Sequence, residues 1–488
     1  MHRLYLFCVL SFIAIACFAK NLSPIDYGFY SASSDLDRFW VLLRVHTDAV
    51  KRGYGITYKG IKQICIEIPK TGQSIPLPHY TDFAGARIKV RNQIKNIPLF
   101  YITQKLKEIN ISKEDLFRGS FIVYPELRRG NVLLIIEDQE KWVAQRRGYS
   151  YGAIRKDILF LKKGKAINQT ISTYNDNVSK PKFYWCRTSE KIVLKNLVYE
   201  RTSDSDKITY LCSIENKNDI LIKNVKIITP NNTGLYADCA IKLENCTNVK
   251  LEDVEIAGTY SLPDKYGYGI GMNNVWNSSF ARLKADGKWG IFGNNNINYA
   301  VVKDSEINRF DIHCYGRDVI CQNTVFRNLY NQFSSLYGIL RFDKCKFINF
   351  IPVLFEYSYS AYSFFNLEFT NSYIEVSKDR PYLILAGKPT QLAELPRHEF
   401  SKVSWPDIKI KDLMVVLPKG INKWTIFQNI GDEGAMIYEL SNIIINGLNV
   451  VSDDKEPLVS LTNKKVDFDN YLNIQLSNSN ISDIIRKE

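Results

Sequence analysis

Carboxylates and a histidine are gathered in a short central part of the sequence, and these residue types carry out acid–base chemistry. The candidates are Asp286, Glu306, Asp311 and His313. Hydrolysis of a glycosidic bond needs two carboxyl groups, ~5 Å apart when the anomeric configuration is retained and ~6.5–9.5 Å apart when it is inverted. We predict that Asp286 and Asp311 form this acid/base pair, that Glu306 is a further candidate, and that His313 tunes or replaces one carboxylate.

Aromatic and cationic residues flank these candidates. Exposed aromatic rings stack on the apolar faces of sugars, and arginine or lysine binds a uronate or another acidic group. The predicted substrate-binding residues are Tyr268, Lys284, Trp289, Arg309, Arg327 and Tyr330. A polysaccharide lyase would instead use His313, an arginine or a lysine as its base, with Ca²⁺ or arginine neutralising the uronate. No other cofactor is expected, and the absence of a Cys-x-x-Cys pair argues against zinc.

The same residues also have purely structural interpretations. Lys226, Glu255, Lys284 and Glu306 would form a charge ladder on the surface, where each ion pair contributes little. Asp286 precedes a glycine, as in many turns. Asp311, His313 and the aromatic residues would then be stacked or partly buried side chains. A convergent carboxylate pair is the feature that would separate an enzyme from a non-catalytic binding protein.

The elements that must position these residues are repeats in the middle of the chain. A polar anchor residue is followed by an alternating segment with an apolar residue three places on, as in Asn196-Leu-Val-Tyr and Asp304-Ser-Glu-Ile. The anchors are Asn196, Asn224, Asp253, Arg282, Asp304, Asn323, Lys344 and Asn371, so successive spacings are 28, 29, 29, 22, 19, 21 and 27 residues. Short period-2 segments separated by Asn, Gly and Asp predict strands and turns, and repeats of this length stack on one another. We therefore predict a parallel β-helix, in which each coil buries its inward residues against its neighbours.

The repeat also places the candidates relative to one another. Alternation puts the second and fourth residues after each anchor on the outside. One small outward patch on three successive coils should therefore contain Lys284, Asp286, Glu306, Asn308 and Arg327. Asp311 and His313 are two residues apart and should both point outward, with Tyr330 and Gln332 one coil later. A second alignment matches Tyr268-Gly-Ile with Trp289-Gly-Ile, 21 residues later. The shortest coils surround the candidates and should form the floor of a groove.

The N-terminal stretch adds a family resemblance. It reads Asp26-Tyr27-Gly28, a helical window at Arg38–Lys51, the strand Ile64–Pro69, and then Gly72. This pattern resembles the entry cap of pectin-lyase-like right-handed β-helix proteins, which include polygalacturonases, pectate-lyase-like enzymes and phage tailspike depolymerases. The resemblance implies an all-β, single-stranded right-handed parallel β-helix with an N-terminal capping helix. The polygalacturonase signatures are absent from the central coils, so the resemblance indicates the fold more than the reaction.

The domain organisation follows from these patterns. Residues 1–19 are predicted to be a signal peptide, residues 22–165 a cap and first coils with an excursion, residues 166–376 the regular helix, and residues 377–488 wider terminal coils or a capping β-element. The excursion includes a short helical window at Ile102–Ile109 and a strand at Val132–Glu137.

The signal peptide indicates export. One positive charge, Arg3, precedes the apolar run Leu4–Phe18, and Ala14–Cys17 forms a loose lipobox that would make Cys17 a lipid anchor. No other segment reaches the ~18 apolar residues of a membrane helix. The protein is therefore expected to be secreted, periplasmic or an outer-surface lipoprotein.

Composition narrows the class of partner. The 488 residues are 45% hydrophobic and 24% charged, which is globular and excludes a disordered chain. Lys+Arg exceeds Asp+Glu by 64 − 51 = 13, which favours an acidic polysaccharide or an anionic surface unless the charge only keeps the protein soluble. Export and the lack of a basic cluster disfavour nucleic acid. The first hypothesis is a hydrolase of acidic polysaccharide; the alternatives are a polysaccharide lyase and a non-catalytic, adhesin-like glycan-binding β-helix.

Overall fold

The computed structural model describes most of the chain. The described residues are 20–92, 94, 97–145, 152–188, 190–201, 209–228, 239–257, 268–285, 291–327, 330–333, 335–355, 362–387, 406–430, 442–453, 455–462 and 473–485. The predicted signal peptide and lipid anchor lie outside these ranges, and so do Asp286 and Trp289. Among the described residues, no helix is long and apolar enough to cross a membrane.

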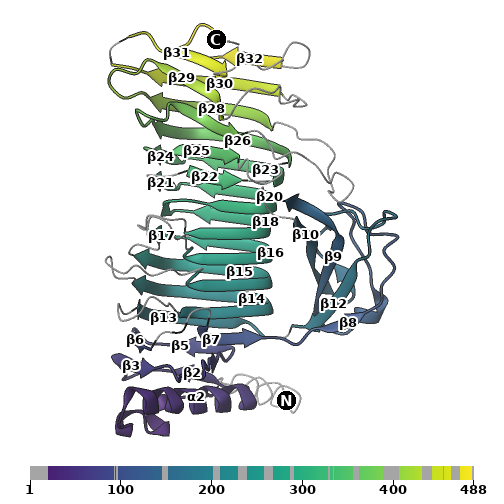
Figure 1. The fold of residues 1–488 in the computed structure, drawn as a ribbon, viewed down its shortest axis with the longest axis vertical. Helices are drawn as coiled ribbons and strands as arrows, with labels where there is room; N and C mark the ends of the chain where they lie inside the picture. Colours follow the sequence, from purple (N-terminus) through teal and green to yellow (C-terminus); the bar gives the residue numbers. More distant parts are fainter. Residues whose placement is uncertain are drawn as a thin grey trace, which may run out of the picture.

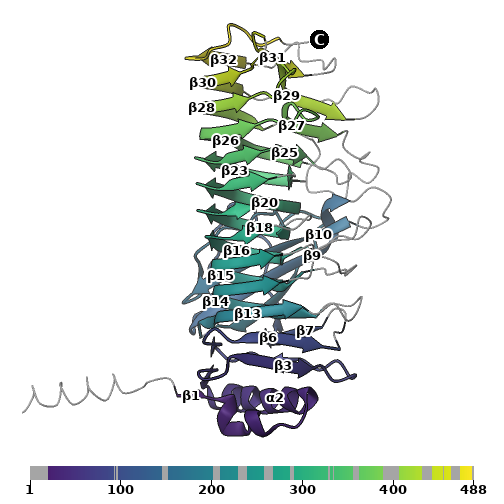
Figure 2. The same ribbon diagram turned by 90° about the vertical axis from the view of Figure 1, so that its left-hand side faces the viewer.

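The main body is a right-handed parallel β-helix, which confirms the predicted fold class (Figures 1 and 2). The described residues of its coils form 27 strands that pair in parallel with the strands of neighbouring coils. They are β1 (Asn21–Leu22), β2 (Gly55–Thr57), β3 (Gln63–Glu67), β4 (Ile75–Pro76), β5 (Tyr80–Asp82), β6 (Arg87–Arg91), β7 (Pro98–Thr103), β13 (Ile192–Arg201), β14 (Tyr210–Ile228), β15 (Ile241–Ala257), β16 (Ile270–Ala281), β17 (Lys284–Ala285), β18 (Phe292–Lys303), β19 (Glu306–Ile307), β20 (Asp311–Gln322), β21 (Val325–Arg327), β22 (Tyr330–Phe333), β23 (Ser335–Asp343), β24 (Lys346–Ile348), β25 (Ile351–Phe355), β26 (Tyr362–Glu375), β27 (Tyr382–Gly387), β28 (Asp407–Val416), β29 (Lys423–Ile430), β30 (Asn442–Val451), β31 (Leu458–Thr462) and β32 (Asn473–Ser477).

The anchor residues of the repeat are the corners of the coils. All eight have positive φ, between 45° and 59°, which is left-handed backbone that Asn and Asp adopt more readily than most residues. Arg282 and Lys344 occupy the same corner, so the coil geometry imposes this conformation even on residues that disfavour it. The strand register reproduces the predicted spacing, since Lys226 pairs with Glu255, Glu255 with Lys284, and Lys284 with Glu306.

Stacked side chains join successive coils inside and at the corners. At the anchor corner the Asn224 amide donates to Asn196 Oδ1 over 2.8 Å, and Asn323 donates to Asp304 over 2.8 Å. Inside, buried aromatic rings lie above one another, as in Phe326 and Phe347, whose centroids are 5.0 Å apart. Burial of these apolar residues between neighbouring coils supplies the main stabilisation of the stack.

A helix covers the N-terminal end of the stack, as predicted (Figure 1). Two 3-10 turns, η1 (Pro24–Tyr27) and η2 (Phe29–Ser31), precede α2 (Asp35–Arg52). Ser34 caps its N-terminus by accepting a 3.0 Å bond from the Asp37 amide, and Gly53 ends it with a φ of 65°. The apolar face of α2 is buried against the first coil, which closes the hydrophobic interior.

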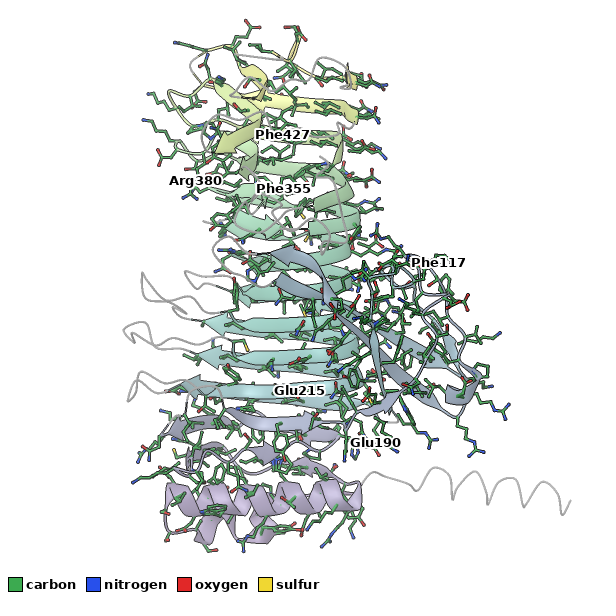
Figure 3. All side chains as sticks on the ribbon, turned by 45° about the vertical axis from the view of Figure 1, so that its right-hand side comes forward. Phe117, Glu190, Glu215, Phe355, Arg380 and Phe427 are labelled. Atoms are coloured by element: carbon green, nitrogen blue, oxygen red, sulfur yellow. The ribbon has the colours of Figure 1, made fainter. Side chains whose placement is uncertain are left out.

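An excursion between β7 and β13 forms a separate antiparallel sheet beside the stack (Figures 1 and 3). It contains β8 (Lys107–Ile109), β9 (Asn131–Gln145), β10 (Gly152–Lys162), β11 (Lys165–Ala166), β12 (Lys182–Arg187) and the turn η3 (Pro125–Leu127), and its strand order is β11-β10-β9-β12-β8. The predicted helical window at Ile102–Ile109 is wrong, because its ends belong to strands β7 and β8. The excursion also extends beyond residue 165, since β12 pairs with β9, and the regular coils begin at β13.

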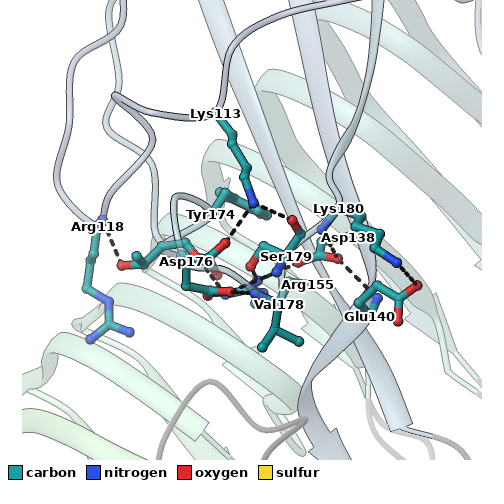
Figure 4. A network of polar contacts seen from close by, with 12 residues as sticks. Lys113, Arg118, Asp138, Glu140, Arg155, Tyr174, Asp176, Val178, Ser179 and Lys180 are labelled. Carbon is teal, nitrogen blue, oxygen red and sulfur yellow. Dashed lines mark hydrogen bonds and ion pairs between the residues drawn. The ribbon is translucent and has the colours of Figure 1, made fainter.

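A buried polar network fixes the excursion (Figure 4). The fully buried Arg155 guanidinium pairs with Asp138 and donates to Ser179, and Lys113 donates to the Ser179 carbonyl over 2.6 Å. Removing one member of such a pair would leave an uncompensated buried charge, so the network holds the loop around Ser179 on the sheet.

The excursion docks on the stack at the middle of the central coils. The ring of Trp276 packs against an apolar cluster of β9, β10 and β12, and Arg317 donates to Gln169 over 3.1 Å. Arg118 lies over the ring of Tyr337, 4.8 Å from its centroid. The excursion is therefore a wall beside the strands that carry the candidate residues.

The C-terminal part continues the helix with wider coils. Ile408 pairs with Ile443 and Ile443 with Ile474, spacings of 35 and 31 residues.

Candidate functional site

The candidate residues of β20 follow a short connection between two strands of their coil. β19 ends at Ile307 and β20 begins at Asp311, so only residues 308–310 connect them. The equivalent connection contains twelve residues between Ala257 and Ile270, and six between Ala285 and Phe292. Long side chains at the start of β20 are therefore not covered by a connection of their own coil.

Two faces of the stack meet at this connection. Face A is the parallel ladder of β4, β7, residues 212–217 of β14, residues 241–246 of β15, residues 270–275 of β16, residues 292–297 of β18, residues 311–316 of β20, β22 and β25. Face C is the ladder of β17, β19, β21 and β24, reached after the anchor corner. Asp311 and His313 belong to face A, whereas Lys284, Glu306 and Arg327 belong to face C.

A four-residue polar network occupies the start of β20. Arg309 Nε donates to Asp311 Oδ1 over 2.5 Å, and Tyr268 Oη donates to Asp311 Oδ2 over 3.0 Å. His313 Nε2 lies 2.8 Å from Tyr268 Oη and 3.4 Å from Asp311 Oδ2. The tyrosine hydroxyl and the imidazole therefore share one hydrogen bond and both face the same carboxylate oxygen.

The next coil supports this network from the other side. Arg309 lies over the ring of Tyr330, 4.5 Å from its centroid, and its Nη1 is 3.4 Å from Tyr330 Oη. Arg309 Nη2 donates to Gln332 Oε1, and Gln332 is the register partner of Asp311. The guanidinium is held by three different side chains and cannot easily reorient.

Burial divides the network into a hidden charge pair and an accessible edge. Asp311 and Arg309 are 0% and 1% exposed, whereas the His313 side chain is 20% exposed. Burial opposes ionisation of Asp311, but the Arg309 charge and His313 outweigh it and lower the pKa of Asp311 below its ordinary value. Burial likewise opposes the charge of Arg309, and Asp311 raises the pKa of Arg309. The lowered pKa favours the carboxylate form of Asp311 at neutral pH.

The structure brings together four of the predicted residues besides Asp311. Tyr268, Arg309, His313 and Tyr330 all contact the network, although they come from three coils. The expectation that Asp311 is exposed is wrong, because Arg309, Tyr268 and Gln332 enclose it. The roles proposed for these residues stay predictions.

Two of the face C candidates, Glu306 and Arg327, form an exposed ion pair, and Lys226 and Glu255 form another. These pairs are of the kind expected for the surface charge ladder that the sequence offered as the structural alternative. Lys226 pairs with Glu255 at 2.7 Å and Arg327 with Glu306 at 2.6 Å, and all four side chains are at least 41% exposed. No interaction found among the described residues joins Glu306, Arg327 or Lys284 to Asp311. Asp286 and Trp289 fall outside the described residues, so the predicted Asp286–Asp311 pair stays a prediction.

Sequence reasoning missed Gly293. The structure pairs Ile270 with Phe292 and Gly271 with Gly293, a spacing of 22 residues, so the predicted 21-residue alignment was one residue out of register. A Cβ at Gly293 would lie 2.4 Å from the Tyr268 ring. The missing side chain lets Tyr268 cross this coil to reach Asp311. The signal in the sequence was the glycine pair itself, Gly271 and Gly293, in one outward column.

Replacing Gly293 with Ala is expected to displace Tyr268 and to break its bonds to Asp311 and His313. The backbone of Gly293 does not require positive φ, so the change acts through the ring contact and leaves the coils intact. Gly271→Ala is the matched control, because a Cβ there meets only the Cys239 side chain at 3.2–3.3 Å. Glycan cleavage or binding and the circular dichroism spectrum should be measured for both variants. Equal activity of the two variants would show that Tyr268 is not needed where it lies.

The network does not suit a calcium ion. Ca²⁺ takes six to eight oxygen ligands, whereas this network has a single carboxylate, whose oxygens already accept bonds from Arg309 and Tyr268. In the part of the chain that the structure describes, no three His, Cys, Asp or Glu side chains are grouped to hold a metal.

Comparisons with known proteins identify the fold. No protein-family model and no curated protein matches the chain. The tailspike Gp54 of Acinetobacter baumannii bacteriophage AP22, solved with A. baumannii capsular saccharide, is 10% identical, with a TM-score of 0.54 over 94% of this chain and 79% of that chain. The tailspike gp49 of Pseudomonas phage LKA1 is 10% identical, with a TM-score of 0.56 over 96% and 80%. The chain therefore shares the parallel β-helix fold of phage tailspikes, as the N-terminal resemblance implied.

Proposed function

We propose that this protein is an exported polysaccharide lyase that cleaves an acidic polysaccharide at the Tyr268–His313 pair. The observation that carries the proposal is the 2.8 Å contact between Tyr268 Oη and His313 Nε2 beside a buried, ionised Asp311. A hydroxyl and an imidazole that share a hydrogen bond can exchange a proton, and the carboxylate stabilises the imidazolium that results.

The proposed reaction is a β-elimination. His313 removes the proton from the carbon next to the uronate carboxyl group, and those electrons form a carbon–carbon double bond. The bond between the neighbouring carbon and the glycosidic oxygen breaks, and Tyr268 Oη supplies the proton that the leaving oxygen needs. His313 returns its proton to Tyr268 after the products leave, so no water is consumed. Asp311, kept ionised by Arg309, holds both groups in place.

Hydrolysis remains the alternative that the sequence first suggested. It requires two carboxyl groups across the bond, and the described network contains one, Asp311, which is buried and ionised. The geometry therefore favours elimination over carboxylate acid/base hydrolysis.

The substrate class is supported by charge and by fold. The net charge of +13 favours an anionic polymer. One tailspike of the same fold was solved with capsular saccharide. The predicted signal peptide would place this protein where such polymers occur. An adhesin-like protein that only binds glycan is the other candidate, and it would need the same face but no proton transfer.

A panel of acidic polysaccharides separates these functions. The protein is incubated, with and without EDTA, with polygalacturonate, alginate, hyaluronan, chondroitin sulfate and uronate-containing bacterial capsules. The masses of the products are then measured by mass spectrometry. Elimination gives fragments that lack one water relative to hydrolysis products, and EDTA should not suppress it. Fragments of full hydrolytic mass would identify a hydrolase. Binding without fragments would identify an adhesin-like protein.

A further inference from the structure

A second site lies at the base of face A, between the stack and its capping helix. It is a pocket of about 660 Å³, a volume typical of small-molecule sites. Its lining includes Thr47 and Lys51 of α2, Tyr101 of β7, Ser213 and Glu215 of β14, and Lys242 of β15. Figure 3 shows Glu215 low on the stack, above the helix.

The polar groups of the pocket are held in place before any ligand arrives. Ser213 Oγ donates to Glu215 Oε1 over 2.9 Å. Lys242 Nζ lies 3.8 Å from the same oxygen and 2.9 Å from Glu244 Oε2. Tyr101 is 41% exposed, so its ring offers a flat apolar surface beside these polar groups. An aromatic face next to fixed hydroxyl, carboxylate and ammonium groups is suited to a sugar ring, whose C–H face stacks while its hydroxyls form hydrogen bonds.

The pocket and the Asp311 network share one column of face A. Tyr101 pairs with Ser213, Ser213 with Lys242, Lys242 with Gly271, and Gly271 with Gly293. The partner of Asn294 is Ile312, so Asp311 follows Gly293 in the same column. Three coil steps of ~4.8 Å separate Lys242 from Asp311, about 14 Å in all. The two positions between them are glycines, beside which lie the Cys239 side chain and the Tyr268 ring of the network.

We infer that the basal pocket is a remote sugar-binding subsite for the polymer that the Asp311 network cleaves. The inference rests on the proposed function, since it assigns the pocket to the same polysaccharide. A chain bound along the column would reach both sites, and Tyr101 would stack on a sugar distant from the broken bond. Binding energy gained there favours long chains over fragments that cannot span the ~14 Å between the sites.

The test compares long and short substrates. Tyr101→Ala, Tyr101→Trp and the wild type are assayed on intact polygalacturonate, or on the panel member that the wild type cleaves, and on a size series of its oligosaccharides. Tyr101→Ala should lower kcat/KM on the intact polymer about tenfold, mainly through KM, which corresponds to ~1.4 kcal/mol of lost stacking. Short oligosaccharides should be cleaved as by the wild type, and Tyr101→Trp should restore the polymer preference. Phe121→Ala, which removes a 61% exposed ring from the excursion, is the control.

The outcomes separate this inference from the proposed function. A wild type that cleaves the polymer, with Tyr101→Ala unchanged on every length, overturns the subsite alone. A loss of equal size on short and long substrates also overturns it, because the residue would then act on the reaction centre or the fold. A wild type that neither binds nor cleaves any panel member overturns the proposed function and the subsite together.

Discussion

His313→Ala is expected to reduce polysaccharide cleavage by roughly 10²–10⁴-fold, the usual contribution of a general acid or base. The imidazole side chain is 20% exposed, so its loss removes the proton acceptor without opening the core. The melting temperature should stay close to that of the wild type. Initial rates on the cleaved panel member and a thermal melt of the same preparations provide the two readings.

Tyr268→Phe is a more conservative variant that tests the same proton transfer. It keeps the ring that crosses Gly293 and removes only the hydroxyl that bonds Asp311 and His313. The loss of rate should be of the same order as for His313→Ala, and the double variant should be little worse than either, because the two groups act as a unit. Full activity of Tyr268→Phe would remove it from the reaction. Tyr30→Phe is the control, since Tyr30 lies in the N-terminal cap and donates to the Gly60 carbonyl.

Asp311→Asn is expected to lower the free energy of unfolding by roughly 3 kcal/mol, because it leaves the buried charge of Arg309 uncompensated. Urea or thermal unfolding measures the change. Glu306→Gln is the matched control, since it breaks an exposed pair with Arg327 and should cost less than about 1 kcal/mol. Arg309→Gln combined with Asp311→Asn should recover part of the loss. Similar small losses for Asp311→Asn and Glu306→Gln would contradict the account of a buried ion pair.

The stability difference between wild type and Asp311→Asn should depend on pH in a defined direction. The pKa of Asp311 is lower in the folded protein than in the unfolded chain, where it is about 3.9. Its contribution is therefore complete above the unfolded value and is lost as pH falls through the folded one. The difference between the two proteins should be constant near neutral pH and should shrink below about pH 4. A difference that grows on acidification would mean that Asp311 is not held ionised.

The coils could be predicted because their periodicity is a local property. The anchor residues recur in the sequence at the same spacing as the register of the coils, and their alternating neighbours determine which side chains are buried. The excursion was harder to predict from the sequence than the coils. Strands β8 and β12 are far apart in sequence and pair only within the antiparallel sheet. Their short apolar segments are equally compatible with a helix or with a regular coil, so sequence placed both the helical window and the start of the coils incorrectly.

The sequence predicted which residues come together at the site, but it did not predict that Asp311 is buried. The i, i+2 spacing of Asp311 and His313 and the coil length brought Arg309, Tyr268 and Tyr330 into the right neighbourhood. The sequence does not show that Arg309 folds back onto Asp311 from the preceding connection, which converts an expected acid into a buried counter-ion. For Glu306, the sequence correctly predicted an exposed side chain but not the face on which it lies. The anchor corner turns Glu306 onto face C, where it pairs with Arg327.

A structure of His313→Ala with a bound oligosaccharide from the cleaved panel member would show where the polysaccharide binds. We expect sugar rings along face A, one of them within hydrogen-bond distance of Tyr268 Oη, and a uronate carbon facing the space left by the imidazole. An oligosaccharide bound instead along the Glu306–Arg327 ladder of face C, or on the excursion, with face A empty, would contradict this expectation.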